Sequence, residues 1–252
     1  MHPYPAGAMR FHAVGTMLAV LCSAPLFSQS PAPTQSQVTI VKVKPDMSRE
    51  WRAYLTNDAN PAVKKAGVKQ RQVWTTATFG EATDYVIVTP VQSLTEFDDP
   101  TPLARALGPD GWTALRAKRQ RLINGSNTFL ITARPELGAT AAAGYQAKLG
   151  VSSRSIVTPG HVADFAKFAK DQTAVLMKTT AKGVYISQIG LGGNPNEFIT
   201  LVLFDSFADI AKFAEAYAKA AAEAKLQPMV NGTVMNNEWR VYRYVPELSI
   251  IP

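Results

Sequence analysis

The sequence predicts an α+β protein that contains a strand–helix–strand–strand–helix–strand unit twice in tandem. Two observations lead to this prediction. The apolar residues change between strand and helix periodicity in the same order in both halves of the chain. Short landmarks also recur in the same order: Val43-Lys44-Pro45 as Val157-Thr158-Pro159, Tyr85-Val86-Ile87-Val88 as Phe198-Ile199-Thr200-Leu201, Asn124-Gly125 as Asn231-Gly232, and Pro135-Glu136-Leu137 as Pro246-Glu247-Leu248. Landmarks that keep their order while their spacing drifts indicate a duplicated module whose loops have changed length.

The composition is that of a globular protein, because 46% of the 252 residues are hydrophobic and 18% are charged. We divide the chain into a first module at 37–137, a linker of small residues at 138–145 and a second module at 146–252. Each module has about 100 residues, a size at which a compact domain can bury its own core.

The first module begins with a strand and a helix. Residues 38–43 alternate between apolar and polar side chains and stop before Pro45, as expected for a strand. Ser48 is a suitable N-cap, and Trp51 and Tyr54 follow it at helical spacing. A strand at 38–43 followed by a helix from Ser48 is therefore expected.

The rest of the first module predicts a hairpin, a helix and a strand. Valine, threonine and aromatic residues dominate 72–79 and 85–88, and a turn between them makes a hairpin. Helical patterns at 102–107 and 112–122 are separated by a glycine–proline break. We expect Asn124-Gly125 to end that helix, with the fourth strand at 128–132.

The second module repeats this order more regularly. Its predicted elements are extended residues at 146–156, a helix from 162, a hairpin of 184–189 and 198–204, a long helix opened by Ser206 and a last strand at 239–244. The order β-α-β-β-α-β is that of the ferredoxin-like unit, with antiparallel strands and both helices on one face of the sheet.

Residues 198–209, which read FITLVLFDSFAD, resemble the junction between the third strand and the second helix in fused dimeric α+β barrel proteins. That group includes NIPSNAP-like, stress-responsive A/B-barrel and antibiotic-biosynthesis-monooxygenase-like proteins, and residues 85–97 are a weaker copy of the junction. The resemblance implies that the two ferredoxin-like sheets, one per module, pack into a barrel-like core. Members of the group differ widely in function, from cofactor-free oxygenation to haem handling, so the resemblance alone does not identify an activity.

The N-terminus has the pattern of an export signal. Arg10 precedes an apolar run at 11–27, after which the chain becomes polar and rich in proline. We therefore expect a signal peptide at 1–28, a disordered segment rich in Pro, Ser and Gln at 29–36, and an exported protein that is periplasmic or secreted. The run is short for a membrane span, so no transmembrane span is expected once the signal is removed.

The only cysteine, Cys22, lies within the predicted signal peptide. A lipid anchor on Cys22 is the disfavoured alternative, because Leu21 stands where a small residue is expected. Removal of the signal would leave no cysteine and a single histidine, His161. Disulfides, thiol nucleophiles and thiolate metal sites are then excluded, and a structural zinc site would lack its usual ligands. We accordingly predict no metal and no cofactor.

The formal net charge of +7 is a mild basic excess that is spread along the chain. Its one dense patch lies on a predicted helix and comprises Arg116, Lys118, Arg119 and Arg121. We interpret the patch as a solvated helix face, with attraction to an anionic surface or ligand as the alternative. No nucleic-acid partner is predicted, because the chain has an export signal and no recognition motif.

Four residues are candidates for a ligand site. His161 follows Pro159-Gly160 at the expected start of a helix, where the dipole favours a neutral imidazole; an exposed helix-start residue is the alternative interpretation. Trp74, Tyr85 and Tyr185 lie on predicted strands, where they fill a core or line a cavity inside a closed barrel.

These observations lead to three hypotheses about function. The first is an exported barrel protein that binds a small apolar ligand or a protein partner. The second is a cofactor-independent, monooxygenase-like enzyme that acts on an aromatic small molecule, for which no catalytic residue can be named. The third is haem binding through His161. Because both modules lie on one chain, the protein is expected to be a monomer with an internal pseudo-dimer, or a homodimer.

Overall fold

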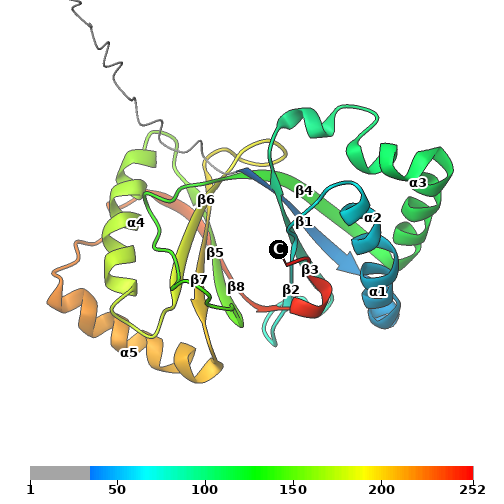
Figure 1. The fold of residues 1–252 in the computed structure, drawn as a ribbon. Helices are drawn as coiled ribbons and strands as arrows, with labels where there is room; N and C mark the ends of the chain where they lie inside the picture. Colours follow the sequence, from blue (N-terminus) through cyan, green and yellow to red (C-terminus); the bar gives the residue numbers. More distant parts are fainter. Residues whose placement is uncertain (1–34, 252) are drawn as a thin grey trace, which may run out of the picture. The chain divides into compact units, whose positions relative to one another are not determined.

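A computed structural model describes residues 35–251, in which eight strands form one closed barrel (Figure 1). The strands are β1 (Gln35–Val43), β2 (Gln72–Thr76), β3 (Asp84–Val91), β4 (Ile123–Ala133), β5 (Leu149–Val157), β6 (Gly183–Ile189), β7 (Glu197–Phe204) and β8 (Val234–Tyr244). Their order around the barrel is β1-β3-β2-β8-β5-β7-β6-β4, and every neighbouring pair is antiparallel. The predicted signal peptide at 1–28 lies outside the described residues. Of the segment predicted to be disordered, Gln35 and Ser36 belong to β1.

Five α-helices lie against the outside of the strands (Figure 1). They are α1 (Ser48–Tyr54), α2 (Asn60–Lys65), α3 (Pro102–Leu122), α4 (Val162–Leu176) and α5 (Phe207–Glu223). Short turns of helix accompany them: η1 (Pro45–Met47), η2 (Leu55–Ala59), η3 (Leu94–Phe97) and η4 (Pro246–Leu248). Within residues 35–251, no helix combines the length and the apolar character that crossing a membrane requires.

The strand order is the same in the two halves of the chain. In the first half the order is β4-β1-β3-β2, and in the second half it is β8-β5-β7-β6. The pairs β2–β8 and β4–β6 join the halves and close the barrel. The structure is thus a mixed α+β fold built on an eight-stranded barrel.

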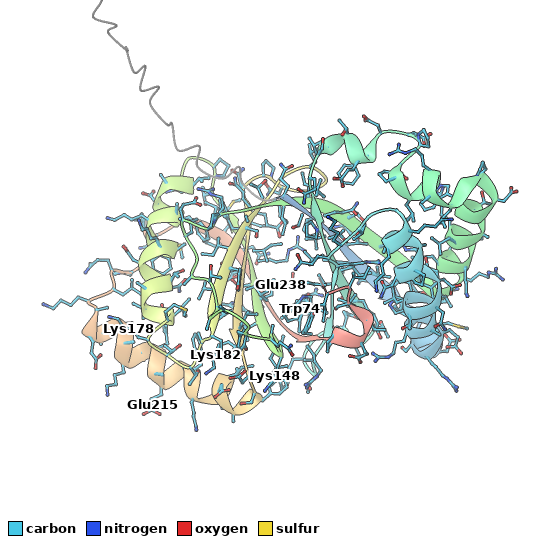
Figure 2. The ribbon with its side chains drawn as sticks, in the orientation of Figure 1. Trp74, Lys148, Lys178, Lys182, Glu215 and Glu238 are labelled. Atoms are coloured by element: carbon cyan, nitrogen blue, oxygen red, sulfur yellow. The ribbon has the colours of Figure 1, made fainter. Side chains whose placement is uncertain are left out.

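Each strand has one face toward the helices and one toward the barrel interior, because successive side chains of a strand alternate. The outward faces make two separate cores with the helices. One contains Trp51, stacked on Tyr54 at a ring distance of 5.4 Å, and the other contains Phe165, 4.6 Å from the ring of Phe198. Trp74, in contrast to Trp51 and Phe165, lies among the strands and not against the helices (Figure 2).

Several local predictions are confirmed. The Ser206 hydroxyl accepts a hydrogen bond from the Asp209 amide and caps α5 as expected. The predicted break in the helix of the first half falls at Gly108, whose φ of 72° interrupts α3. Ser48, by contrast, begins α1 but is not its side-chain N-cap, because Met47 occupies that position.

The helix ends just before Asn124-Gly125, but the prediction that the fourth strand begins only at residue 128 is wrong. Both residues lie inside β4, which follows α3 directly and pairs with β1 along its length. A register shift between Lys42 and Val43 accommodates this junction. The hydrogen bonds of the β1–β4 ladder thus override the local turn preference of the Asn-Gly pair.

Five charged side chains form two ion-paired groups toward the end of the barrel where β1 and β5 finish. Arg154 Nε lies 2.6 Å from Glu197 Oε1. On β8, Arg240 binds Glu238 at 2.6 Å and reaches Asp84 on β3 at 3.1 Å. The Asp84 side chain is 1% exposed, and within residues 35–251 its Oδ1 atom has no hydrogen-bond partner. Burial raises the pKa of Asp84, although the positive charges of Lys42 and Arg240 partly offset this effect.

We expect Arg240→Met to lower the free energy of unfolding by about 3 kcal/mol at pH 7, because it leaves the buried Asp84 carboxylate without its ion-pair partner. Burial makes the folded state favour protonated Asp84. The contribution of Asp84 to the free energy of unfolding is therefore most favourable below the usual aspartate pKa of about 3.9, and it is lost as the pH rises through the raised pKa of the folded state. The loss in Arg240→Met should therefore shrink toward pH 4, as measured by urea unfolding.

The double variant Arg240→Met/Asp84→Asn should recover most of that stability at pH 7 because it removes the unpaired charge. Lys182→Met is the control, since Lys182 forms an ion pair with Asp205 at 3.4 Å in which both side chains are more than one-third exposed. It should change stability by less than about 1 kcal/mol. An equal loss in Arg240→Met at both pH values would contradict the assigned role of Asp84.

Candidate functional site

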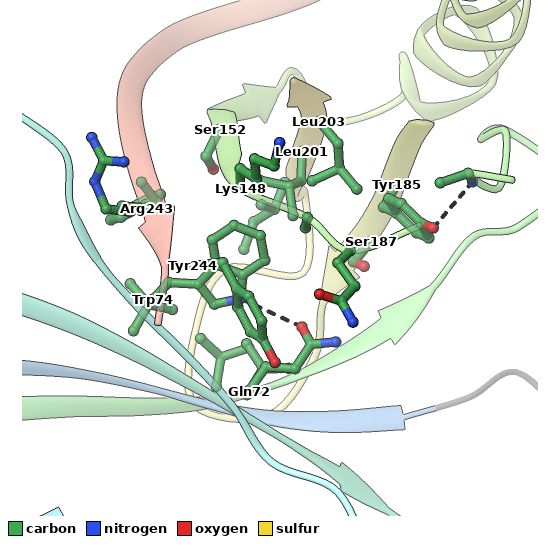
Figure 3. A pocket seen from close by; sticks show the side chains of 18 of the residues that line it. Gln72, Trp74, Lys148, Ser152, Tyr185, Ser187, Leu201, Leu203, Arg243 and Tyr244 are labelled. Atoms are coloured by element: carbon green, nitrogen blue, oxygen red, sulfur yellow. Dashed lines mark hydrogen bonds between the residues drawn. The ribbon is translucent and has the colours of Figure 1, made fainter. Parts of the chain in front are cut away.

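The interior of the barrel holds a cavity of about 880 Å³. It reaches the surface, since its lining includes the exposed residues Ala143, Lys148 and Ile251. Figure 3 shows side chains from several strands meeting around it. This volume lies within the range of pockets that hold small molecules.

All eight strands contribute inward-facing side chains to this lining. The apolar wall is formed by residues at alternate positions on four of them: Val38 and Ile40, Val86 and Val88, Phe129 and Ile131, and Ile199, Leu201 and Leu203. The spacing of two follows from strand geometry, because every second side chain points to the same face. Apolar groups from segments far apart in the sequence therefore enclose a single space.

One side of the cavity is aromatic. The rings of Trp74 and Tyr244 lie 5.1 Å apart at 57°, and Trp74 Nε1 donates a hydrogen bond of 3.4 Å to Gln72 Oε1 (Figure 3). Gly150 lies close to them, since a Cβ atom there would lie 2.7 Å from Leu201 Cδ1 and 3.3 Å from Trp74 Cζ3, so a larger residue would displace the Leu201 side chain. The aromatic surface and the aliphatic wall meet over this glycine.

Arg154 is the charged group of the inner wall. Its Nε donates a hydrogen bond to Glu197, and its guanidinium carbon lies 5.5 Å from the centre of the Phe129 ring. Two hydroxyl groups face the same space, those of Ser152 and Ser187. The inner part of the cavity is therefore apolar with a few polar groups directed into it.

The segment between β4 and β5 covers part of the cavity. The amide of Ala141 donates a hydrogen bond of 3.2 Å to Tyr185 Oη (Figure 3). The Tyr145 hydroxyl is buried and has no hydrogen-bond partner within residues 35–251. Burial, followed by the neighbouring charge of Asp205, raises the pKa of Tyr145 to about 12, so the phenol stays protonated at neutral pH.

The four residues predicted from the sequence have different locations. Trp74 and Tyr185 line the cavity. Tyr85 faces the helices, where its ring lies 6.0 Å from that of Trp51, because its neighbour Val86 has the inward position on β3. His161 stands at the N-cap of α4, with Nδ1 2.9 Å from Asp164 Oδ2, and is not part of the lining.

Arg154, Ser152 and Ser187 were not recognised as site residues from the sequence. A signal for Arg154 existed. In the second half, the outer face of the strands packs against the apolar sides of the helices. A charged residue in the middle of β5 is therefore expected on the opposite face, which points into the barrel. For the serines no such signal is present, because small polar residues occur on both faces of β5.

The cavity offers no histidine to a metal or haem iron, since His161 is the one histidine of residues 35–251 and lies outside it. Haem ligation through His161 thus stays a prediction that the cavity does not support. In the part of the chain that the structure describes, no group of three or more His, Cys, Asp or Glu side chains is placed to hold a metal ion.

No family model matches the sequence, and no curated protein matches it. Solved structures do match its fold. A candidate monooxygenase from Fusobacterium nucleatum subsp. nucleatum aligns with a TM-score of 0.58 at 13% identity, covering 85% of this chain and 94% of its own. An anthrone oxidase-like protein aligns with a TM-score of 0.57 at 10% identity, covering 85% and 92%.

A third similar structure is a mutant chlorite dismutase from Candidatus Nitrospira defluvii, with a TM-score of 0.55 at 10% identity and coverage of 85% and 92%. Likeness at such low identity concerns the fold alone. The α+β barrel of this chain is therefore similar to that of dimeric α+β barrel proteins, in agreement with the resemblance to the monooxygenase-like group in the sequence.

Proposed function

We propose that the barrel interior binds a small, largely apolar organic molecule. The observation that carries this proposal is the cavity of about 880 Å³ with aliphatic walls from four strands. A well-packed protein core leaves few voids larger than a water molecule, so a space of this size inside a barrel is expected to bind a ligand. The aromatic side formed by Trp74 and Tyr244 favours a planar ring, which can stack against it.

We expect Leu201→Trp to weaken binding by about tenfold or more, because the larger side chain would fill part of the cavity. The probe is N-phenyl-1-naphthylamine, a neutral dye whose fluorescence rises in apolar sites. Met235→Trp is the matched control, since Met235 is 61% exposed on β8 and does not line the cavity. Failure of the parent protein to bind this dye saturably, together with an intact mass free of any co-purified molecule, would argue against the proposal.

A second candidate function is cofactor-independent oxygenation of an aromatic molecule in the same cavity. Two observations favour it: the similar structures include a candidate monooxygenase and an anthrone oxidase-like protein, and the cavity has an aromatic side. In such a reaction an activated CH₂ group is oxidised to a carbonyl by O₂. One oxygen atom enters the product, and the other leaves as water with the two hydrogens.

If this activity is present, anthrone added to the protein should consume one O₂ per molecule converted, as followed with an oxygen electrode and by absorbance of the quinone. Leu201→Trp should reduce the rate by about tenfold, because substrate and dye compete for one space. Met235→Trp should leave it unchanged. Absence of oxygen consumption with anthrone and with a panel of phenols would contradict the second candidate and leave ligand binding in place.

We also infer that the two halves are tandem ferredoxin-like copies, as the resemblance to NIPSNAP-like and stress-responsive A/B-barrel proteins implies. The common strand order supports this inference. So do the register shifts at Lys42/Val43 and Ile156/Val157, which fall at corresponding places in β1 and β5. In addition, each half has a buried carboxylate at the start of the corresponding strand: Asp84 begins β3 and Glu197 begins β7.

Export of the protein is part of the same proposal and is supported by Arg10 and the apolar run behind it. If residues 1–28 are a signal peptide, the intact mass of protein purified from its own host should match a chain that begins close to Gln29. A mass that retains residues 1–28 would contradict cleavage.

A further inference from the structure

Three polar side chains come together on one wall of the cavity. Ser152 and Arg154 occupy successive inward positions on β5. Arg154 pairs in register with Ile199 on β7, and Ile199 pairs with Ser187 on β6, so Arg154 and Ser187 lie at the same level of the barrel. An otherwise apolar wall thus carries one guanidinium, with one hydroxyl at the preceding inward position of β5 and another two strands away on β6.

Contacts on two sides orient the guanidinium of Arg154. Glu197, which is 8% exposed, accepts from Nε at 2.6 Å, and the Phe129 ring lies 5.5 Å from the guanidinium carbon. Within residues 35–251 the donation from Nε is the one hydrogen bond that the Arg154 side chain makes to the protein. The two terminal nitrogens are therefore available to the cavity, and their planar fork matches the two oxygens of a carboxylate.

The charges around the cavity favour an anion as well. Among the charged residues that line it, Lys148, Arg154 and Arg243 are basic and Asp205 is acidic. Asp205 is paired with Lys182 at 3.4 Å and Arg154 with Glu197 at 2.6 Å, so Lys148 and Arg243 supply the excess of positive charge. A lining with an excess of positive charge and low-dielectric walls raises the local concentration of an anionic ligand.

We propose that the molecule bound in the cavity is an aromatic carboxylate, with its ring against Trp74 and the aliphatic wall and its carboxylate on the terminal nitrogens of Arg154, assisted by Ser152 and Ser187. This inference rests on the proposed ligand-binding function and names the chemical class of its ligand. Arg154 then selects the acid over neutral compounds of the same shape, since a neutral group cannot replace the charge-assisted hydrogen bonds.

The test is isothermal titration calorimetry at pH 7 with 2-naphthoate and with naphthalene-2-carboxamide, which has nearly the same shape and no charge. The full protein should bind the acid at least about tenfold more tightly than the amide. The double variant Arg154→Gln/Glu197→Gln should lose this preference while its affinity for the amide stays within about twofold. The second substitution prevents an unpaired Glu197 carboxylate from destabilising the barrel.

Two further variants sharpen the result. Arg154→Lys keeps the charge but loses the planar fork, so it should retain only part of the preference. Lys212→Gln removes an exposed cation of α5 that does not line the cavity and should retain all of it. Equal binding of acid and amide by the parent protein, or a preference that survives in Arg154→Gln/Glu197→Gln, would overturn the proposal while leaving the cavity a ligand site. If neither probe binds while the parent protein still binds N-phenyl-1-naphthylamine, only the acid preference is refuted; if the dye also fails to bind, the result argues against the proposed function as well.

Discussion

Closure of eight strands into one barrel is the constraint on which the other features of this structure depend. The pairs β2–β8 and β4–β6 complete the ring, and the helices of both halves occupy its outside. Most strands consequently have two buried or partly buried faces, one toward helices and one toward the interior, whereas β8 exposes Met235 and Trp239 on its outer face. Because the helices fill only the outer layer, the inner faces must either pack against each other or enclose a space. Near Trp74 and Leu201 they enclose a cavity, and at the far end they hold charged residues.

The distribution of charge inside the barrel follows from the cost of burying ions. Asp84, Glu197, Arg154 and Arg240 lie on inward or barely exposed positions, and each of them forms an ion pair. Arg154 has a special place among them, since it forms an ion pair with Glu197 and also lines the cavity. One part of its guanidinium stabilises the end of the barrel, and the other part faces the ligand space. A substitution of Arg154 would therefore affect both the stability of the barrel and the proposed ligand binding.

The similar structures and the cavity carry different kinds of information. Identities of 10–13% to a candidate monooxygenase, an anthrone oxidase-like protein and a chlorite dismutase concern the arrangement of strands and helices. The side chains inside the barrel determine what such a fold can bind. Here those side chains are aliphatic, aromatic and, at Arg154, cationic, while the one described histidine caps a helix on the outside. The combination directs attention to aromatic acids rather than to a histidine-ligated haem.

The sequence by itself determined the local elements of this protein, and the tertiary structure decided what those elements face. Alternating residues predicted β1, valine and aromatic residues predicted β3, and Ser206 predicted the start of α5, because strand preference and helix capping are properties of a few neighbouring residues. The same alternation could not tell that Trp74 points inward while Tyr85 points toward α1, since each strand has two equivalent-looking faces until the barrel closes. Nor could it place Ser187 level with Arg154, because that relation passes through the pairing of β7 with both β5 and β6. Contacts between distant strands depend on the whole closed sheet, and no short stretch of sequence contains them.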